Sequence, residues 1–70
     1  MSYTTPKQRR ERGERILEYL QQYGPQKEFQ ISEFMGYSMT TVRRDLSVLF
    51  RHNRVCIKFS GHGFRRWSAV

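Results

Sequence analysis

The stretch ISEFMGYSMTTVRRDL, residues 31–46, decides the fold of this chain. Its first half places apolar residues at positions i, i+3 and i+4 of a helix, namely Ile31, Phe34 and Met35. Gly36 tolerates the left-handed backbone that ends a helix, and the hydroxyl of Ser38 can accept a backbone N–H at the start of the next one. The stretch therefore predicts two helices joined by a tight turn.

The second of these helices has one apolar face and one cationic face. Its apolar residues keep helical spacing and are Val42, Leu46, Leu49 and Phe50. At about 100° per residue the opposite face carries Thr40, Arg44, Ser47 and Arg51, with Arg43 on the flank. We expect the apolar face to enter the core and the helix to end near Asn53.

A longer helix is predicted upstream. Thr5 is a suitable cap, Pro6 is favoured at the first helical position, and Gln8 can bond back to the cap. The stripe expected to face the core is Ile16, Leu17, Leu20 and Tyr23, and the helix is expected to end at Gly24 and Pro25. Between this helix and the next, residues 27–30 predict a short strand around Phe29.

A hairpin is predicted after the cationic helix. Val55, Ile57 and Phe59 alternate with Cys56 and Lys58, the pattern of a half-buried strand. A tight turn at Gly61, His62 and Gly63 places Ile57 opposite Trp67 and Val55 opposite Ala69. The same register puts Arg65 beside Phe59 on the inner face and makes Lys58 and Arg66 an outward pair.

The order of these elements is typical of an α+β winged helix-turn-helix. Three helices accompany a small antiparallel sheet: helix, short strand, helix, recognition helix and a two-stranded wing. Seventy residues are enough for one small core. We expect a flexible tail at residues 1–5 and a single domain at residues 6–70.

The run Thr41, Val42, Arg43, Arg44, Asp45 and Leu46 resembles the T-[VI]-R-R-D-L recognition helix of DeoR-type bacterial repressors. That family also has a hydrophobic first helix and a turn of glycine, an apolar residue and serine, and the resemblance covers roughly the middle third of the chain. Gln30 departs from the expected Ser or Thr cap, and Tyr37 from a smaller turn residue. The resemblance implies a winged helix-turn-helix that binds operator DNA. The sugar-binding effector domain of such repressors does not fit in 70 residues. In layout the chain resembles small stand-alone winged-helix regulators of fimbrial operons, phages and plasmids.

The charge distribution points to a polyanionic partner. The net charge is +7, and residues 37–70 hold seven basic side chains against Asp45 alone. Such a concentrated positive field attracts nucleic acid and steers association. Together with the predicted helix-turn-helix, it favours double-stranded DNA as the partner.

Candidate DNA contacts follow from position. Early residues of a recognition helix reach base edges, and arginine can donate two hydrogen bonds to guanine. The candidate base-reading residues are Thr40, Arg43 and Arg44, with Met39 and Ser47 as lesser candidates. The candidate phosphate or wing contacts are Ser38, Thr41, Arg51, Lys58, His62, Arg65 and Arg66.

Several charged residues have two interpretations. Asp45 flanks the apolar stripe and is expected to form an ion pair that orients an arginine rather than to contact a base. Arg9, Arg10 and Arg12 could contact phosphates, but Glu11 and Glu14 interleave with them as on an ordinary solvated helix face.

Other function classes find little support. The three candidate catalytic residues, His52, His62 and Cys56, match no nucleophile or metal motif, so we expect no enzyme, cofactor or metal site. A single cysteine excludes an intrachain disulfide and suits a reducing cytoplasm. No apolar run predicts a membrane span or signal peptide, and no small-molecule site is evident. The aromatic residues expected in the core, rather than on a base-stacking surface, are Tyr19, Tyr23, Phe29 and Trp67.

The sequence thus predicts a cytoplasmic, sequence-specific double-stranded-DNA-binding transcriptional regulator that occupies operator DNA as a repressor would. A winged-helix protein-interaction module or antirepressor that meets an acidic partner is the alternative, and RNA binding is a third. Whether the chain forms a homodimer or binds a partner regulator is left open.

Overall fold

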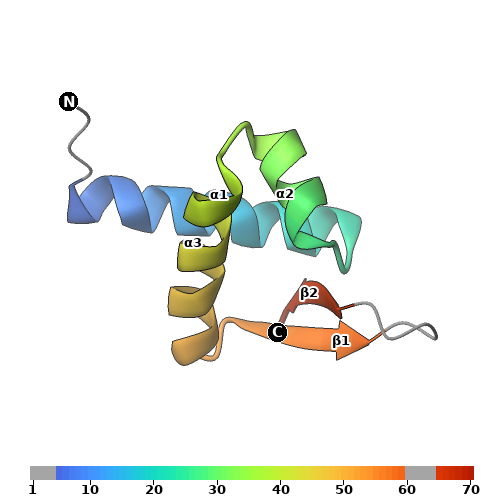
Figure 1. The fold of residues 1–70 in the computed structure, drawn as a ribbon. Coiled ribbons are helices and arrows are strands. Elements are labelled where there is room, and N and C mark those ends of the chain that lie inside the picture. Colours follow the sequence, from blue (N-terminus) through green and yellow to red (C-terminus); the bar gives the residue numbers. More distant parts are fainter. Residues whose placement is uncertain (1–4, 60–64) are drawn as a thin grey trace.

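The computed structural model describes residues 5–59 and 65–70. In this part of the chain, three helices precede a two-stranded antiparallel sheet (Figure 1). The elements are α1 (Pro6–Tyr23), α2 (Glu28–Met35), α3 (Met39–Arg51), β1 (Val55–Phe59) and β2 (Arg65–Ala69). The predicted fold class, α+β winged helix-turn-helix, is confirmed. The tail at residues 1–4 and the turn at residues 60–64 lie outside the described residues.

The start of α1 is the predicted capping box. The Thr5 side chain accepts a hydrogen bond from the Gln8 backbone N–H at 3.2 Å, and the Thr5 N–H donates to the Gln8 side chain at 3.0 Å. The helix ends at Gly24, where φ is 79°, a backbone angle that glycine adopts without steric cost.

The predicted strand at residues 27–30 is wrong, because a helix forms there. Lys27 has extended backbone and precedes the first residue of α2, and the Gln30 side chain accepts the Lys27 N–H at 2.8 Å. Gln30 therefore occupies the third helical position, where glutamine stabilises a helix start. Just before this segment, Gln26 pairs with β2 in the manner of a strand: it exchanges two backbone hydrogen bonds with Trp67, at 2.7 and 2.9 Å.

The core lies where the three helices meet the sheet. The buried apolar residues are Ile16, Leu17, Tyr19, Leu20, Ile31, Val42, Leu46, Leu49, Val55 and Trp67. The predictions that Tyr23 and Phe29 belong to the core are wrong: they are 53% and 51% exposed. Tyr23 is the last residue of α1 and extends past the packed part of the helix, whereas Tyr19, one turn earlier, is buried.

Two further residues on predicted apolar faces are also half exposed. Phe34 stacks on Tyr19 with ring centroids 4.3 Å apart, yet it remains 59% exposed. Phe50 meets Trp67 edge-on at 6.0 Å and remains 49% exposed. Both rings lie at the border of the core, which in a chain this short is too small to enclose them.

The register of the sheet is confirmed at every predicted pair. These pairs are Val55 with Ala69, Ile57 with Trp67, Lys58 with Arg66 and Phe59 with Arg65. Burial decreases along β1 from Val55 to the exposed Phe59. Phe59 follows the alternation of Val55 and Ile57 and pairs with Arg65 as predicted, but both residues are exposed, because they lie at the end of the sheet that is farther from the core.

Candidate nucleic-acid interface

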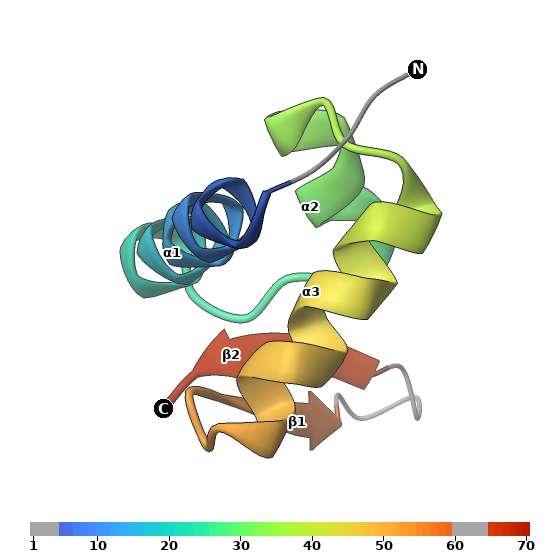
Figure 2. The same cartoon turned by 90° about the vertical axis from the view of Figure 1, so that its left-hand side faces the viewer.

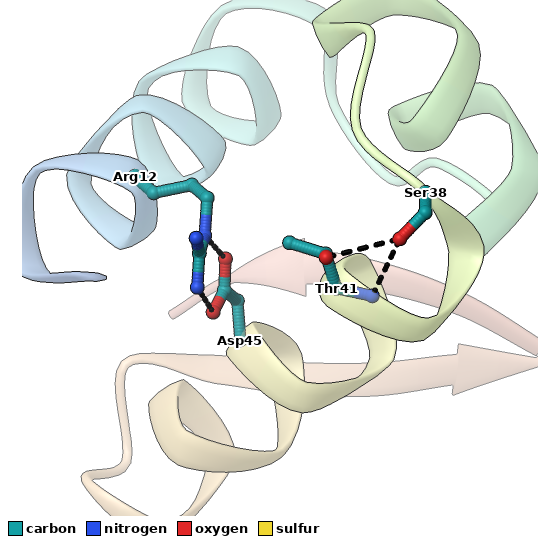
Figure 3. Close-up of polar contacts among 4 residues, drawn as sticks. All are labelled: Arg12, Ser38, Thr41 and Asp45. Carbon is teal, nitrogen blue, oxygen red and sulfur yellow. Dashed lines mark hydrogen bonds and ion pairs between the residues drawn. The ribbon is translucent and has the colours of Figure 1, made fainter. Parts of the chain in front are cut away.

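The start of α3 is fixed by its cap (Figure 3). Gly36 adopts left-handed backbone with φ 75°, and Ser38 then accepts the Thr41 backbone N–H at 3.2 Å through its side-chain oxygen. The Ser38 hydroxyl also contacts the Thr41 hydroxyl at 3.0 Å. The cap predicted at Ser38 is confirmed, and it presents two hydroxyl groups beside the first N–H groups of the helix, a place where anions bind readily.

An ion pair joins α3 to α1. The Arg12 guanidinium donates to both carboxylate oxygens of Asp45, from Nη2 to Oδ1 at 2.9 Å and from Nε to Oδ2 (Figure 3). The Asp45 side chain is 6% exposed and that of Arg12 is 18% exposed. The hydrogen bond to Asp45 raises the pKa of Arg12, so the guanidinium stays protonated. The expected ion pair of Asp45 is confirmed. In this pair the Arg12 guanidinium is engaged by Asp45 and holds α3 against α1.

A second carboxylate ties α3 to α2 and to the sheet. Glu28 Oε2 accepts from Arg43 Nε at 2.7 Å, and Glu28 Oε1 accepts from the Trp67 indole N–H at 3.3 Å. The Glu28 side chain is 18% exposed, whereas that of Arg43 is 65% exposed. Glu28 therefore holds one edge of the Arg43 guanidinium and leaves most of that side chain in solvent. Sequence reasoning did not find this residue, because its partners lie 15 and 39 residues away.

The outer face of α3 presents most of the predicted contact residues. Exposed positions in and just before α3 are Ser38, Thr40, Arg43, Arg44, Ser47 and Arg51, while Met39 and Thr41 are half-buried. Among residues 5–59 and 65–70, Arg44 and Arg51 have no acidic partner. The face is therefore cationic and open to a ligand.

The sheet adds a second cationic surface. Lys58 lies opposite Arg66, and Arg65 is the first residue of β2, at the end of the sheet that is farther from the core. Lys58 and Arg65 are exposed and Arg66 is half-buried. His62, the remaining predicted wing contact, lies outside the described residues.

A groove of about 450 Å³ separates the amino-terminal half of α1 from α3. Arginines from both helices line it, including Arg10 and Arg44. Figure 2 views α1 along its axis, with α3 running across beside it. Sequence reasoning missed the groove, because the crossing of α1 and α3 depends on tertiary packing.

Other kinds of site find no support in the described residues. No three His, Cys, Asp or Glu side chains of residues 5–59 and 65–70 gather where they could hold a metal ion. In the same part of the chain, no helix combines the length and apolar character needed to cross a membrane.

Comparison with known proteins agrees with this geometry. The chain is similar to the Zalpha domain of PKZ from Carassius auratus, which was solved in complex with Z-DNA: the TM-score is 0.78 and the identity 26%, over 89% of this chain and 97% of that one. It is also similar to the apo-Zalpha domain of zebrafish PKZ, with a TM-score of 0.82 and 24% identity over 89% and 95% of the two chains. The chain matches none of the curated proteins with which it was compared. Residues 12–61 match the DeoR-like helix-turn-helix domain. The chain therefore belongs to the DeoR-like helix-turn-helix domain family.

Proposed function

We propose that this protein is a sequence-specific double-stranded-DNA-binding transcriptional regulator. The observation that carries the proposal is the exposed cationic face of α3, held in place by the Arg12–Asp45 pair and by Glu28. Membership of the DeoR-like helix-turn-helix family supports a role in DNA binding. In this proposal α3 enters the major groove of duplex DNA, and the β1–β2 hairpin contacts the backbone or the minor groove.

Base reading is assigned to the outer face of α3. Arg43 and Arg44 each carry a guanidinium that can donate two parallel hydrogen bonds to O6 and N7 of guanine. The remaining base-reading candidates are Thr40, Met39 and Ser47. Arg44 is the stronger candidate for base reading, because Glu28 already accepts a hydrogen bond from one edge of the Arg43 guanidinium.

Backbone contacts are assigned around this face. The hydroxyls of Ser38 and Thr41, beside the start of α3, suit one phosphate. The other candidate contacts are Arg51, Lys58, His62, Arg65 and Arg66. If about five to seven basic side chains neutralise phosphates, the logarithm of the affinity falls with the logarithm of the salt concentration with a slope of roughly −4 to −6.

Selection of bound duplexes from a random DNA pool tests the proposal. An enriched sequence motif, together with a steep salt dependence on that motif, supports a sequence-specific regulator. Salt-sensitive binding without enrichment rejects sequence specificity, and it favours a protein-interaction or RNA-binding role for the cationic face. No binding to any duplex at low salt rejects DNA binding.

A left-handed duplex is a second candidate ligand. The supporting observation is the similarity to a Zalpha domain solved with Z-DNA, at 26% identity over 89% of this chain. Titration of the protein into an alternating dC–dG duplex, followed by circular dichroism of the DNA, separates the two candidates. Inversion of the DNA spectrum at moderate salt supports recognition of the left-handed form, and an unchanged right-handed spectrum rejects it.

A further inference from the structure

The groove between α1 and α3, called the α1–α3 groove below, is lined by cationic and apolar residues. Its lining includes Arg10 from α1 and Arg44 from α3. The apolar part of the lining includes Gly13, Val48 and Leu49. The Val48 side chain is 39% exposed although it is apolar. Cationic groups beside exposed carbon atoms suit a ligand that combines negative charge with a carbon framework.

Two carboxylates line the groove, but neither neutralises Arg10 or Arg44. Asp45 is bound by Arg12, which approaches from outside the groove. Glu14 pairs with Arg54 at 3.5 Å. Within the described part of the chain, Arg10 and Arg44 have no acidic partner. The groove therefore keeps a net positive charge that is available to an anion.

The position of the groove connects it to the outer face of α3. Arg44 belongs both to that exposed face and to the groove lining. The amino-terminal half of α1 projects past α3, so the two helices form a corner (Figure 1). A duplex docked on α3 would have one of its strands next to this corner.

We infer that the α1–α3 groove holds a sugar-phosphate strand of the bound duplex, with Arg10 as a phosphate contact outside the recognition helix and the wing. This inference rests on the proposed function and adds a third contact region to it. Deoxyribose carbons would lie against Val48, and the phosphate would meet the guanidinium of Arg10. The contact at Arg10 thus helps to fix the orientation of the duplex, and base readout stays with the outer face of α3, including Arg44.

The structure divides the charged residues of the amino-terminal half of α1 between two hollows. Glu11 and Arg15 line a separate hollow on α1 together with Tyr37, away from the α1–α3 groove. Arg10 lies on the groove side with Glu14, which is engaged by Arg54. Both faces of α1 therefore carry arginines and a glutamate, and on the groove side the glutamate is paired with Arg54 rather than with Arg10.

A matched pair of variants tests the inference. Arg10→Ala removes a charge from the groove, and Arg15→Ala removes the same charge from the same helix at an exposed position outside it. We expect Arg10→Ala to lower affinity for a selected duplex and for a scrambled duplex alike, by roughly threefold to tenfold, and to reduce the salt slope by about 1. Arg15→Ala should leave the slope unchanged. Circular dichroism of both variants checks that α1 remains folded.

The outcomes separate this inference from the proposed function. A greater loss of slope in Arg10→Ala than in Arg15→Ala supports a strand in the groove. Equal effects of the two variants, whether both bind like the wild type or both lose the same amount, overturn the groove contact while the wild type still binds DNA. If the wild-type protein binds no duplex, the proposed function fails and the groove inference fails with it.

Discussion

Replacing Arg12 with methionine should destabilise the domain strongly, because it leaves the Asp45 carboxylate buried without its partner. Asp45 is 6% exposed and receives two hydrogen bonds from Arg12. Removing one member of a fully buried pair costs about 3–5 kcal/mol. The Arg12 side chain is 18% exposed, so in the variant water can partly solvate the Asp45 carboxylate. We therefore expect the free energy of unfolding to fall by about 2–4 kcal/mol.

Thermal and urea unfolding of Arg12→Met measure this loss. For a domain of this size each kcal/mol shifts the melting temperature by about 4–8 °C, so the expected decrease is roughly 8–32 °C. The fluorescence of Trp67 reports on unfolding, because this single tryptophan is 8% exposed in the fold. Arg15→Met makes the same change at an exposed site and should alter stability by less than about 0.5 kcal/mol.

A double variant separates the buried charge from lost packing. Arg12→Met with Asp45→Leu replaces the ion pair by two apolar side chains and should recover most of the stability. The reasoning would be refuted if Arg12→Met unfolded like Arg15→Met, or if the double variant were no more stable than the single one.

Three further predictions concern other parts of the structure. Gly13→Ala should stabilise the domain by up to about 1 kcal/mol, because the new Cβ would lie 3.5 Å from the Leu49 side chain, an ordinary contact; a lower melting temperature would contradict this. Burial raises the pKa of Tyr19 above 10.0, so the folded state holds this proton more tightly than the unfolded state and stability should fall as the pH rises above about 10. Tyr19→Phe should make this loss shallower in urea unfolding at pH 9 and 11, and parallel losses would refute the assignment. Glu28→Ala should reduce the ratio of affinities for selected and scrambled duplexes, because Arg43 loses the contact that orients it; an unchanged ratio would show that Glu28 does not serve recognition.

Local signals in the sequence were sufficient for the turn, the cap and the hairpin. The spacing of Gly36 and Ser38 placed the cap of α3, and the alternation from Val55 to Phe59 set a register that the structure reproduces. These features depend on backbone conformation and side-chain alternation over a few residues, so a single sequence carries them.

The remaining features depend on contacts between distant residues. Phe29 looked like the centre of a strand, yet the Gln30 side chain begins a helix there. Neither the sharing of Glu28 between Arg43 and Trp67 nor the α1–α3 groove follows from any local pattern, because both require the packed arrangement of helices and sheet. That Asp45 would pair with an arginine was predictable from its place beside the apolar stripe, whereas the identity of Arg12 as its partner was not.

The most direct test of the account is the ratio of affinities for a selected duplex and a scrambled duplex in Arg44→Ala, with Lys58→Ala as the control. The exposed position of Arg44 on α3 predicts that its removal weakens the selected duplex by about 1–3 kcal/mol and the scrambled duplex far less, so the ratio falls. Lys58 lies on the sheet, where its removal should weaken both duplexes alike and leave the ratio unchanged. Equal losses on the two duplexes in Arg44→Ala would contradict base reading by α3.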